Sequence, residues 1–273
     1  MILWTDPLHA LPVQTLHATG LLAVFAWTMA SVPRSERWLV GPVCLGGVAA
    51  AALGGRAAWL LGQWLGGQGV LPVQWWHPTA GGYASLGLVA GGGVWLAVLA
   101  CAWRGDGAKV RGWLDALVPA GALGLGLARL GCLVRGCDVG AALEQGRGLL
   151  GVRYLRVAPE VADLGAHHPF ALYLSAATIV WTLGVCAVVP RGRAQRALGV
   201  GAGYLCIRAA LEPWRHASHT PTLAGWSLHS LMALAGLALT GLAIAAWIQY
   251  GGGLQVLCSR EVERATTDHD DGR

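Results

Sequence analysis

The sequence predicts an all-α integral membrane bundle of about seven transmembrane helices. Of its 273 residues, 55% are hydrophobic and 12% are charged, and the mean hydropathy is +0.53. A chain of this composition has too few polar side chains to cover the surface of a soluble globule of its size. Its apolar residues also gather in runs long enough to cross a bilayer, and basic clusters separate alternate runs.

The apolar runs set the expected order of the helices, since about 20 mainly apolar residues span ~30 Å of hydrocarbon. We expect spans at about 15–32, 39–65, 84–103, 113–134, 168–189, 196–212 and 226–249. The 41 glycines indicate close helix packing. Residues 1–258 are expected to form one transmembrane domain, with a small outer, periplasmic-side cap at about 135–167. A short polar tail follows at 259–273.

The basic side chains predict the orientation of the chain. Basic clusters occupy every second connection: Arg34 and Arg37, then Arg104, Lys109 and Arg111, then Arg191, Arg193 and Arg196, then Arg260 and Arg264. By the positive-inside rule these connections are cytoplasmic, which places the N-terminus outside and the C-terminus inside. The long outer segment 135–167 is an exception, since it also carries four arginines, which Glu144, Glu160 and Asp163 partly offset. The first 14 residues lack a cationic region and a small-residue cleavage site, so we expect no removable signal peptide. The arginines form no patch with interleaved aromatics, which argues against nucleic acid as a partner.

Arg129 is the leading candidate site residue because it lies in the middle of a long apolar run, GALGLGLARLGCLVRGCDVG. A cation at such a depth costs at least ~2.5 kcal/mol and therefore needs a partner or a polar cavity. A functional role is favoured over a structural ion pair or a snorkelling side chain. Asp115 opens the fourth expected span, fourteen residues earlier, and is interpreted as an acid at a helix N-terminus.

The sixth expected span carries a second group of polar residues. Tyr204, Arg208, Glu212 and Arg215 recur at i, i+4, i+8 and i+11 and would share one helix face, although Pro213 would kink or end the helix. Two cations and an acid on this face could hold a phosphate, with the acid orienting one guanidinium. The alternative is an Arg208–Glu212 pair that satisfies itself and binds no ligand.

Further candidates lie in the second and third spans. Arg56, in GGRAAW, is a third buried cation, either functional or a structural anchor. Gly81 and Gly82 could bring backbone N–H groups to a lipid phosphate or could simply allow close packing. The histidines and the seven cysteines form no metal-ligand spacing and no CxxC pair, and no glycine run fits a dinucleotide site. We therefore expect no metal and no cofactor.

At these residues the sequence resembles the prolipoprotein diacylglyceryl transferase family. The positions of the family signature are matched here by eight residues: Asp115, Pro119, Gly124, Gly126, Arg129, Gly131, Gly136 and Gly140. Three further blocks agree in order, namely GGRAAW, HPFALY and GYLCIRAALEPWR. The last is the most specific, since Tyr204, Arg208, Glu212 and Arg215 match the family helix in register.

The resemblance implies an enzyme of the bacterial inner membrane that uses no cofactor. Its donor would be phosphatidylglycerol, and its acceptor the lipobox cysteine thiol of a prolipoprotein signal peptide, giving a thioether and glycerol 1-phosphate. The catalytic residues would be Arg129, Arg208 and Glu212. The substrate-binding residues would be Arg129, Tyr204, Arg215, Gly81, Gly82, Gly131, Gly140 and Arg56.

Several positions depart from the family pattern. The family's essential tyrosine falls on Thr19 and its histidine on Leu86, while Cys132, Arg135 and Cys137 replace two asparagines and an acid. The general base is therefore unassigned among Glu212, His77 and His168. The alternative function is that of a non-catalytic or altered-acceptor paralogue that binds anionic phospholipid or a lipoprotein precursor.

Overall fold

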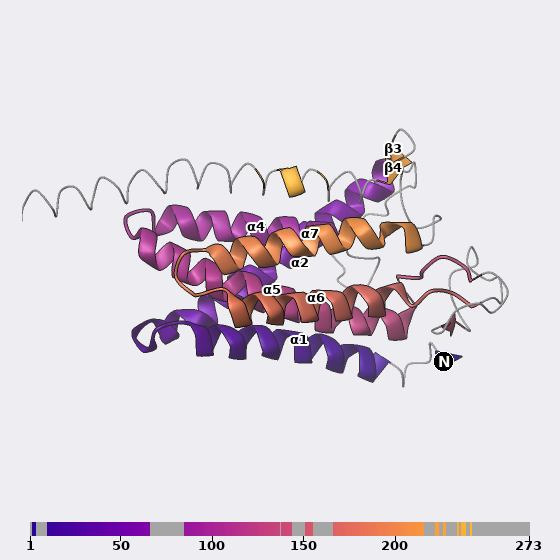
Figure 1. Ribbon diagram of the computed structural model, residues 1–273, viewed down its shortest axis with the longest axis horizontal. Helices are drawn as coiled ribbons and strands as arrows, with labels where there is room; N and C mark the ends of the chain where they lie inside the picture. The colour runs from indigo at the N-terminus through magenta and orange to yellow at the C-terminus, as the bar shows by residue number, and fades with distance from the viewer. Residues whose placement is uncertain are drawn as a thin grey trace, which may run out of the picture.

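The computed structural model describes residues 2–3, 10–65, 85–136, 138–143, 151–154, 166–215, 222–223, 226–227, 234, 236–238 and 241. Over these residues the protein is an all-α membrane bundle, as the sequence predicts (Figure 1). Gly81, Gly82, His77 and the tail at 259–273 lie outside the described residues.

The described helices follow the expected spans closely. They are α1 (Ala10–Ser31), α2 (Val40–Leu65), α4 (Ser85–Ala102), α5 (Gly107–Arg135), α6 (Phe170–Val188) and α7 (Gln195–Leu211). Two 3₁₀ turns, η2 (Arg34–Leu39) and η5 (Glu212–Trp214), precede α2 and follow α7. By length and hydropathy, the segments Arg34–Trp64, Gly107–Val134 and Phe170–Val188 can each cross a membrane.

The seventh expected span, 226–249, lies largely outside the described residues. At its start the structure differs from the prediction, because Trp226–Ser227 is strand β4, which pairs antiparallel with β3 (Thr222–Leu223). A parallel pair joins β1 (Ile2–Leu3) to β2 (Arg153–Tyr154). These two-residue strands lie in segments outside the described helices.

Helix α5 is the centre of the bundle, and it packs against α1, α6 and α7, while α2 pairs with α4. The connections 32–39, 103–106 and 189–194 lie together at one end, the left end in Figure 1, which we refer to as the loop end. An apolar core near this end joins Trp113 and Ala116 of α5 to Val40 of α2 and Leu99 of α4. The opposite end of α5 carries the polar residues of interest.

Two helix pairs depend on glycine for their separation. On α4, a Cβ added at Gly91 would lie 2.1 Å from the carbonyl oxygen of Ala50, and one at Gly87 would lie 2.3 Å from that of Gly54. Between α1 and α5, a Cβ at Gly20 would lie 2.7 Å from the Gly124 carbonyl oxygen. Backbone atoms cannot move aside as a side-chain tip can, so these glycines set the α2–α4 and α1–α5 distances.

Replacing Gly91 with alanine is expected to destabilise the α2–α4 pair by about 1–3 kcal/mol, because the new methyl group overlaps the Ala50 carbonyl. Gly93, two residues on, is the matched control, since a Cβ there meets nothing within 4 Å. Gly93→Ala should be neutral or slightly stabilising because alanine is the better helix former. The midpoint of thermal aggregation in detergent measures both effects, and equal midpoints would contradict the packing argument.

The start of α5 corrects one expectation. The helix begins at Gly107, and Asp106 is its N-cap, since its side chain accepts the Lys109 N–H at 2.9 Å. Asp115 therefore does not open the span. It lies about two turns inside α5 and is buried, with 3% of its surface exposed.

Candidate functional site

A short extended segment after α5 builds the end of the bundle opposite the loop end. Helix α5 stops at Gly136, whose φ of 70° is a left-handed conformation that favours glycine, and whose N–H donates to the Cys132 carbonyl. Residues 138–143, referred to as the strap, then run between η5 and the start of α6. The Ala141 N–H donates to the Trp214 carbonyl at 2.7 Å, and the Ala141 carbonyl accepts from the His168 N–H at 3.0 Å. The strap thus ties together the ends of α5, α6 and α7.

Gly140 allows the strap to approach so closely. A Cβ at this position would lie 2.2 Å from the His168 carbonyl oxygen, and Gly140 also forms an isolated β-bridge with Arg215. Its carbonyl oxygen lies 3.1 Å from Nδ1 of the buried His167. The structure therefore places Gly140 in backbone packing, while Gly131 is buried within α5.

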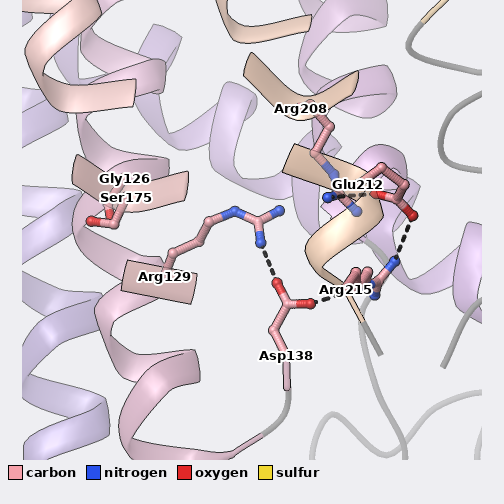
Figure 2. A network of polar contacts seen from close by, with 7 residues as sticks. All are labelled: Gly126, Arg129, Asp138, Ser175, Arg208, Glu212 and Arg215. Carbon is pink, nitrogen blue, oxygen red and sulfur yellow. Dashed lines mark hydrogen bonds and ion pairs between the residues drawn. The ribbon is translucent and has the colours of Figure 1, made fainter. Parts of the chain in front are cut away.

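Five charged side chains meet beside the strap, and Figure 2 shows the four ion contacts that join them. Nη1 of Arg129 lies 2.6 Å from Oδ2 of Asp138, and Oδ1 of Asp138 lies 3.2 Å from Nε of Arg215. Glu212 places Oε1 at 3.8 Å from Nη1 of Arg215 and Oε2 at 2.7 Å from Nη1 of Arg208. These residues are referred to as the arginine cluster. Their side-chain exposure runs from 1% for Arg208 to 12% for Arg215.

The end of α7 brings three of these residues together. The helix stops at Leu211, and Glu212, Pro213 and Trp214 form the 3₁₀ turn η5, which leaves Arg215 in extended backbone. The expected stripe on one helix face therefore holds through Glu212, which contacts Arg208 one turn earlier, but not for Arg215. Because the chain bends after Glu212, Arg215 reaches Asp138 of the strap, which a straight helix would not allow it to approach in the same way.

The cluster keeps buried hydrogen-bond donors that the described residues do not use. Nε and Nη2 of Arg129, and Nε and Nη2 of Arg208, make no hydrogen bond of standard geometry with the described part of the chain. Leaving a buried donor in this condition costs about 1–3 kcal/mol, and more when the donor is charged. Three guanidiniums and two carboxylates also leave one net positive charge. The arrangement is suited to binding an anion.

A family comparison covers most of the chain, including the whole arginine cluster. The profile of the prolipoprotein diacylglyceryl transferase family matches residues 14–248. The chain belongs to the prolipoprotein diacylglyceryl transferase family. A comparison with curated proteins gave no match. Its family makes the protein a membrane transferase of lipoprotein biosynthesis that acts on prolipoprotein and lipid substrates.

Tyr204 borders the cluster in this transferase. It is buried one turn before Arg208 and packs with Phe170 and Leu174 of α6. Its hydroxyl lies within hydrogen-bonding reach of the Arg129 guanidinium, although the contact falls short of standard hydrogen-bond geometry. The Arg208 guanidinium in turn lies 5.1 Å from the centre of the Phe170 ring. One wall of the site is therefore aromatic and holds both α7 residues in place.

Asp138 is the residue that sequence reasoning missed. It is the only acid between Arg129 and Gly140, and it stands between Cys137 and Val139 in the stretch GCDVG. An acid nine residues after a buried arginine is a signal that could have been used, because a buried cation needs a counter-charge. The resemblance places the family's acid at Cys137, one residue before Asp138, which makes the contacts to Arg129 and Arg215.

Of the remaining expected residues, Arg56 lies on α2, and two glycines lie outside the described residues. Arg56 is buried on α2, and its guanidinium stacks over Trp59 at 5.0 Å from the ring centre. Thr19, at the position of the family's tyrosine, is exposed on α1 and donates its hydroxyl to the Thr15 carbonyl at 2.8 Å. Gly81 and Gly82 cannot be placed, since they lie outside the described residues.

Proposed function

We propose that this transferase moves a diacylglyceryl group from phosphatidylglycerol to the lipobox cysteine thiol of a prolipoprotein, forming a thioether. The observation that carries the proposal is the pair of buried guanidiniums, Arg129 and Arg208, whose N–H donors beside the strap are not satisfied by hydrogen bonds of standard geometry within the described residues. Figure 2 shows the Arg129 side chain extending toward the Arg208–Glu212 pair, so that donors from α5 and α7 face a common region. A lipid phosphate can accept hydrogen bonds from both helices there.

The charge of the cluster suits this donor. A phosphodiester carries one negative charge, which balances the one net positive charge of the arginine cluster. As the bond to the glyceryl carbon breaks, the phosphate gains a second negative charge. Guanidiniums that are already fixed in a site without bulk water stabilise that developing charge strongly, since they need little reorganisation. Because this charge develops only as the bond breaks, its stabilisation lowers the barrier to transfer as well as strengthening lipid binding.

The chemical step is a displacement at the terminal glyceryl carbon. The cysteine sulfur forms a bond to that carbon, and the bond from the carbon to the phosphate oxygen breaks with its electron pair going to the oxygen. The thiol proton passes to an oxygen of the departing phosphate, which leaves as glycerol 1-phosphate. A cationic environment also favours the thiolate form of the acceptor, which is the nucleophilic form.

Glu212 is assigned an orienting role rather than that of general base. Its Oε2 contacts Arg208, and its Oε1 faces Arg215, so both oxygens are directed at guanidiniums. These two contacts let Glu212 orient the arginines, and neither oxygen is left facing the acceptor thiol. Glu212 and Asp138 fix the arginines, Arg129 and Arg208 contact the phosphate, and Tyr204 shapes the wall of the pocket. Arg56, Gly81, Gly82 and Gly131 complete the proposed lipid-binding region.

The predicted topology supports an inner-membrane location for this chemistry. With the basic loop end in the cytoplasm, the arginine cluster lies in the outer half of the bacterial inner membrane. This is the depth at which outer-leaflet phosphates and the translocated lipobox both arrive. The N-terminus is then outside, and the polar tail is cytoplasmic.

One observation favours the alternative of a paralogue that binds without transfer. Thr19 is exposed on α1, and its short hydroxyl is occupied by the Thr15 carbonyl, so no phenol from this position enters the cluster. A binding paralogue would show saturable binding of phosphatidylglycerol vesicles but no product. The two functions therefore differ in a single measurement.

The test uses the purified full chain in liposomes of phosphatidylglycerol, with a synthetic lipobox peptide as acceptor. Mass spectrometry of the peptide should show one added diacylglyceryl group on cysteine, and this group should resist hydroxylamine, which cleaves thioesters but not thioethers. A peptide with serine in place of the cysteine is the control acceptor, and vesicles of phosphatidylethanolamine are the control donor. Tight vesicle binding with no modified peptide would replace the proposal with the binding alternative.

A further inference from the structure

Asp115 is a buried acid that the proposed reaction does not use. It projects from α5 near the loop end, where its carboxylate accepts three backbone N–H groups of the α6–α7 connection and the first turn of α7. Oδ2 accepts from Gly192 at 2.8 Å and from Ala194 at 3.1 Å, and Oδ1 accepts from Ala197 at 3.1 Å. One side chain of α5 thus caps the start of another helix.

The connection is shaped around this carboxylate. Gly192 has φ of 97° and Ala194 has φ of 59°, so two residues adopt left-handed conformations that turn their N–H groups inward. Arg196 closes the turn, since its Nε donates to the Val189 carbonyl at 2.6 Å. Helix α7 has no side-chain cap of its own, because Ala194 occupies the N-cap position. The N–H groups of Ala194 and Ala197 have no acceptor within the helix, and Asp115 supplies one to each from α5.

On both α5 and α7, the residues of the Asp115 contact and the residues of the arginine cluster lie on the same face of the helix. Asp115 and Arg129 are fourteen residues apart on α5, and Ala197 and Arg208 are eleven apart on α7. Both spacings are close to whole numbers of turns at 3.6 residues each, so each pair shares a face. On α7 the buried residues Ala197, Val200, Tyr204 and Arg208 mark that face. The cap thus lies ~21 Å along α5 from Arg129, at 1.5 Å per residue.

We propose that Asp115 is a positioning residue that fixes the axial register of α7 against α5, and so sets the placement of Arg208 relative to Arg129. Its carboxylate is the one group that holds the start of α7 through charged hydrogen bonds from α5 within the described residues. Without it, α7 can slide or rotate on an otherwise apolar contact. The catalytic consequence rests on the proposed transferase function, but the register itself does not.

The register can be measured directly with spin labels on lipid-facing positions. Cys206 of α7 is exposed, and a Cβ added at Gly121 of α5 would meet nothing within 4 Å. The labelled variant keeps Cys206, carries Gly121→Cys and has the other six cysteines replaced by alanine. Pulsed electron resonance then measures the distance between the labels on α5 and α7. In Asp115→Ala the distribution should shift or broaden by about one or two residue rises, ~1.5–3 Å.

A second variant removes the interaction from the other helix. Ala197→Pro deletes one N–H donor to Asp115, in the first helical turn where that N–H has no intrahelical acceptor. It should change the distance in the same direction, by a smaller amount. Asp106→Ala, which removes the local cap of α5, is the matched control and should leave the distance unchanged.

Activity with native cysteines gives the second measurement. Misplacing one guanidinium by about an ångström should lower kcat by about 10- to 100-fold in Asp115→Ala, with little change in KM for the lipid. Asp115→Asn keeps one acceptor oxygen and should fall between wild type and alanine. Unchanged distances in both Asp115→Ala and Ala197→Pro would overturn the proposal. A shifted distance in a chain whose wild type transfers nothing would support the register and reject the transferase function alone.

Discussion

Replacing Arg129 with alanine is expected to lower kcat for diacylglyceryl transfer by about 10²–10³-fold, the usual cost of losing one preorganised donor to a developing oxyanion. The substitution removes two buried donors and the net positive charge of the cluster together. The fold should survive, because Asp138 keeps its second partner, Arg215, at 3.2 Å. The loss should therefore appear in turnover rather than in yield or thermal stability.

Two further variants distinguish charge from geometry at this position. Arg129→Lys restores the charge but offers a single ammonium in place of a planar fork, so it should recover only part of the rate. Arg193→Ala removes an exposed arginine at the loop end and should leave the rate unchanged. The measurement is initial velocity against phosphatidylglycerol content in mixed vesicles. A wild-type rate for Arg129→Ala would remove this residue from the phosphate-binding role.

Replacing Asp138 with alanine should have the opposite signature, a large loss of stability. It leaves Arg129 and Arg215 buried without their shared carboxylate, and breaking a buried ion pair from one side costs about 3–5 kcal/mol. A loss of that size is a large part of the free energy of unfolding of most domains. The midpoint of thermal unfolding in detergent should fall accordingly, together with activity.

The double variant Asp138→Ala/Arg215→Met tests whether the lost stability comes from unpaired charge. Methionine fills part of the arginine volume without a charge, so the double variant should unfold at a higher temperature than Asp138→Ala alone. Additive losses in the two single variants would instead show that the strap is held by its backbone hydrogen bonds and that the ion pairs contribute little. Asp106→Ala, an exposed cap at the other end, is the control for removing an acid.

The helices and two of the key arginines could be predicted because their signals are local. Apolar runs of the right length fixed α2, α4, α6 and α7 to within a few residues, since hydrocarbon thickness sets the length of a span. Arg129 and Arg208 stood out because a cation in an apolar run is costly without a partner. The end of α7 was also foreseeable from Pro213, which cannot continue the helical hydrogen bonds.

The partners of these residues could not be predicted from the same signals. Asp138 pairs with Arg129 only because Gly136 reverses the chain, and with Arg215 only because η5 bends away from α7. Asp115 was interpreted as an acid at the start of its own helix, whereas it caps α7, which begins about 80 residues later. Both pairings depend on tertiary contacts, which cannot be predicted from the spacing of residues along one helix.

The cap formed by Asp115 also has a consequence for biogenesis. The ribosome delivers α5 to the membrane long before α7, because the three N–H donors lie 77 to 82 residues further along the chain. Arg129 meets its counter-charge after only nine residues, but Asp115 must wait for α7 with its charge unmatched. Helix α5 therefore gains its contacts at this end only after α7 has entered the membrane, so the last part of the fold to form here joins segments made at different times.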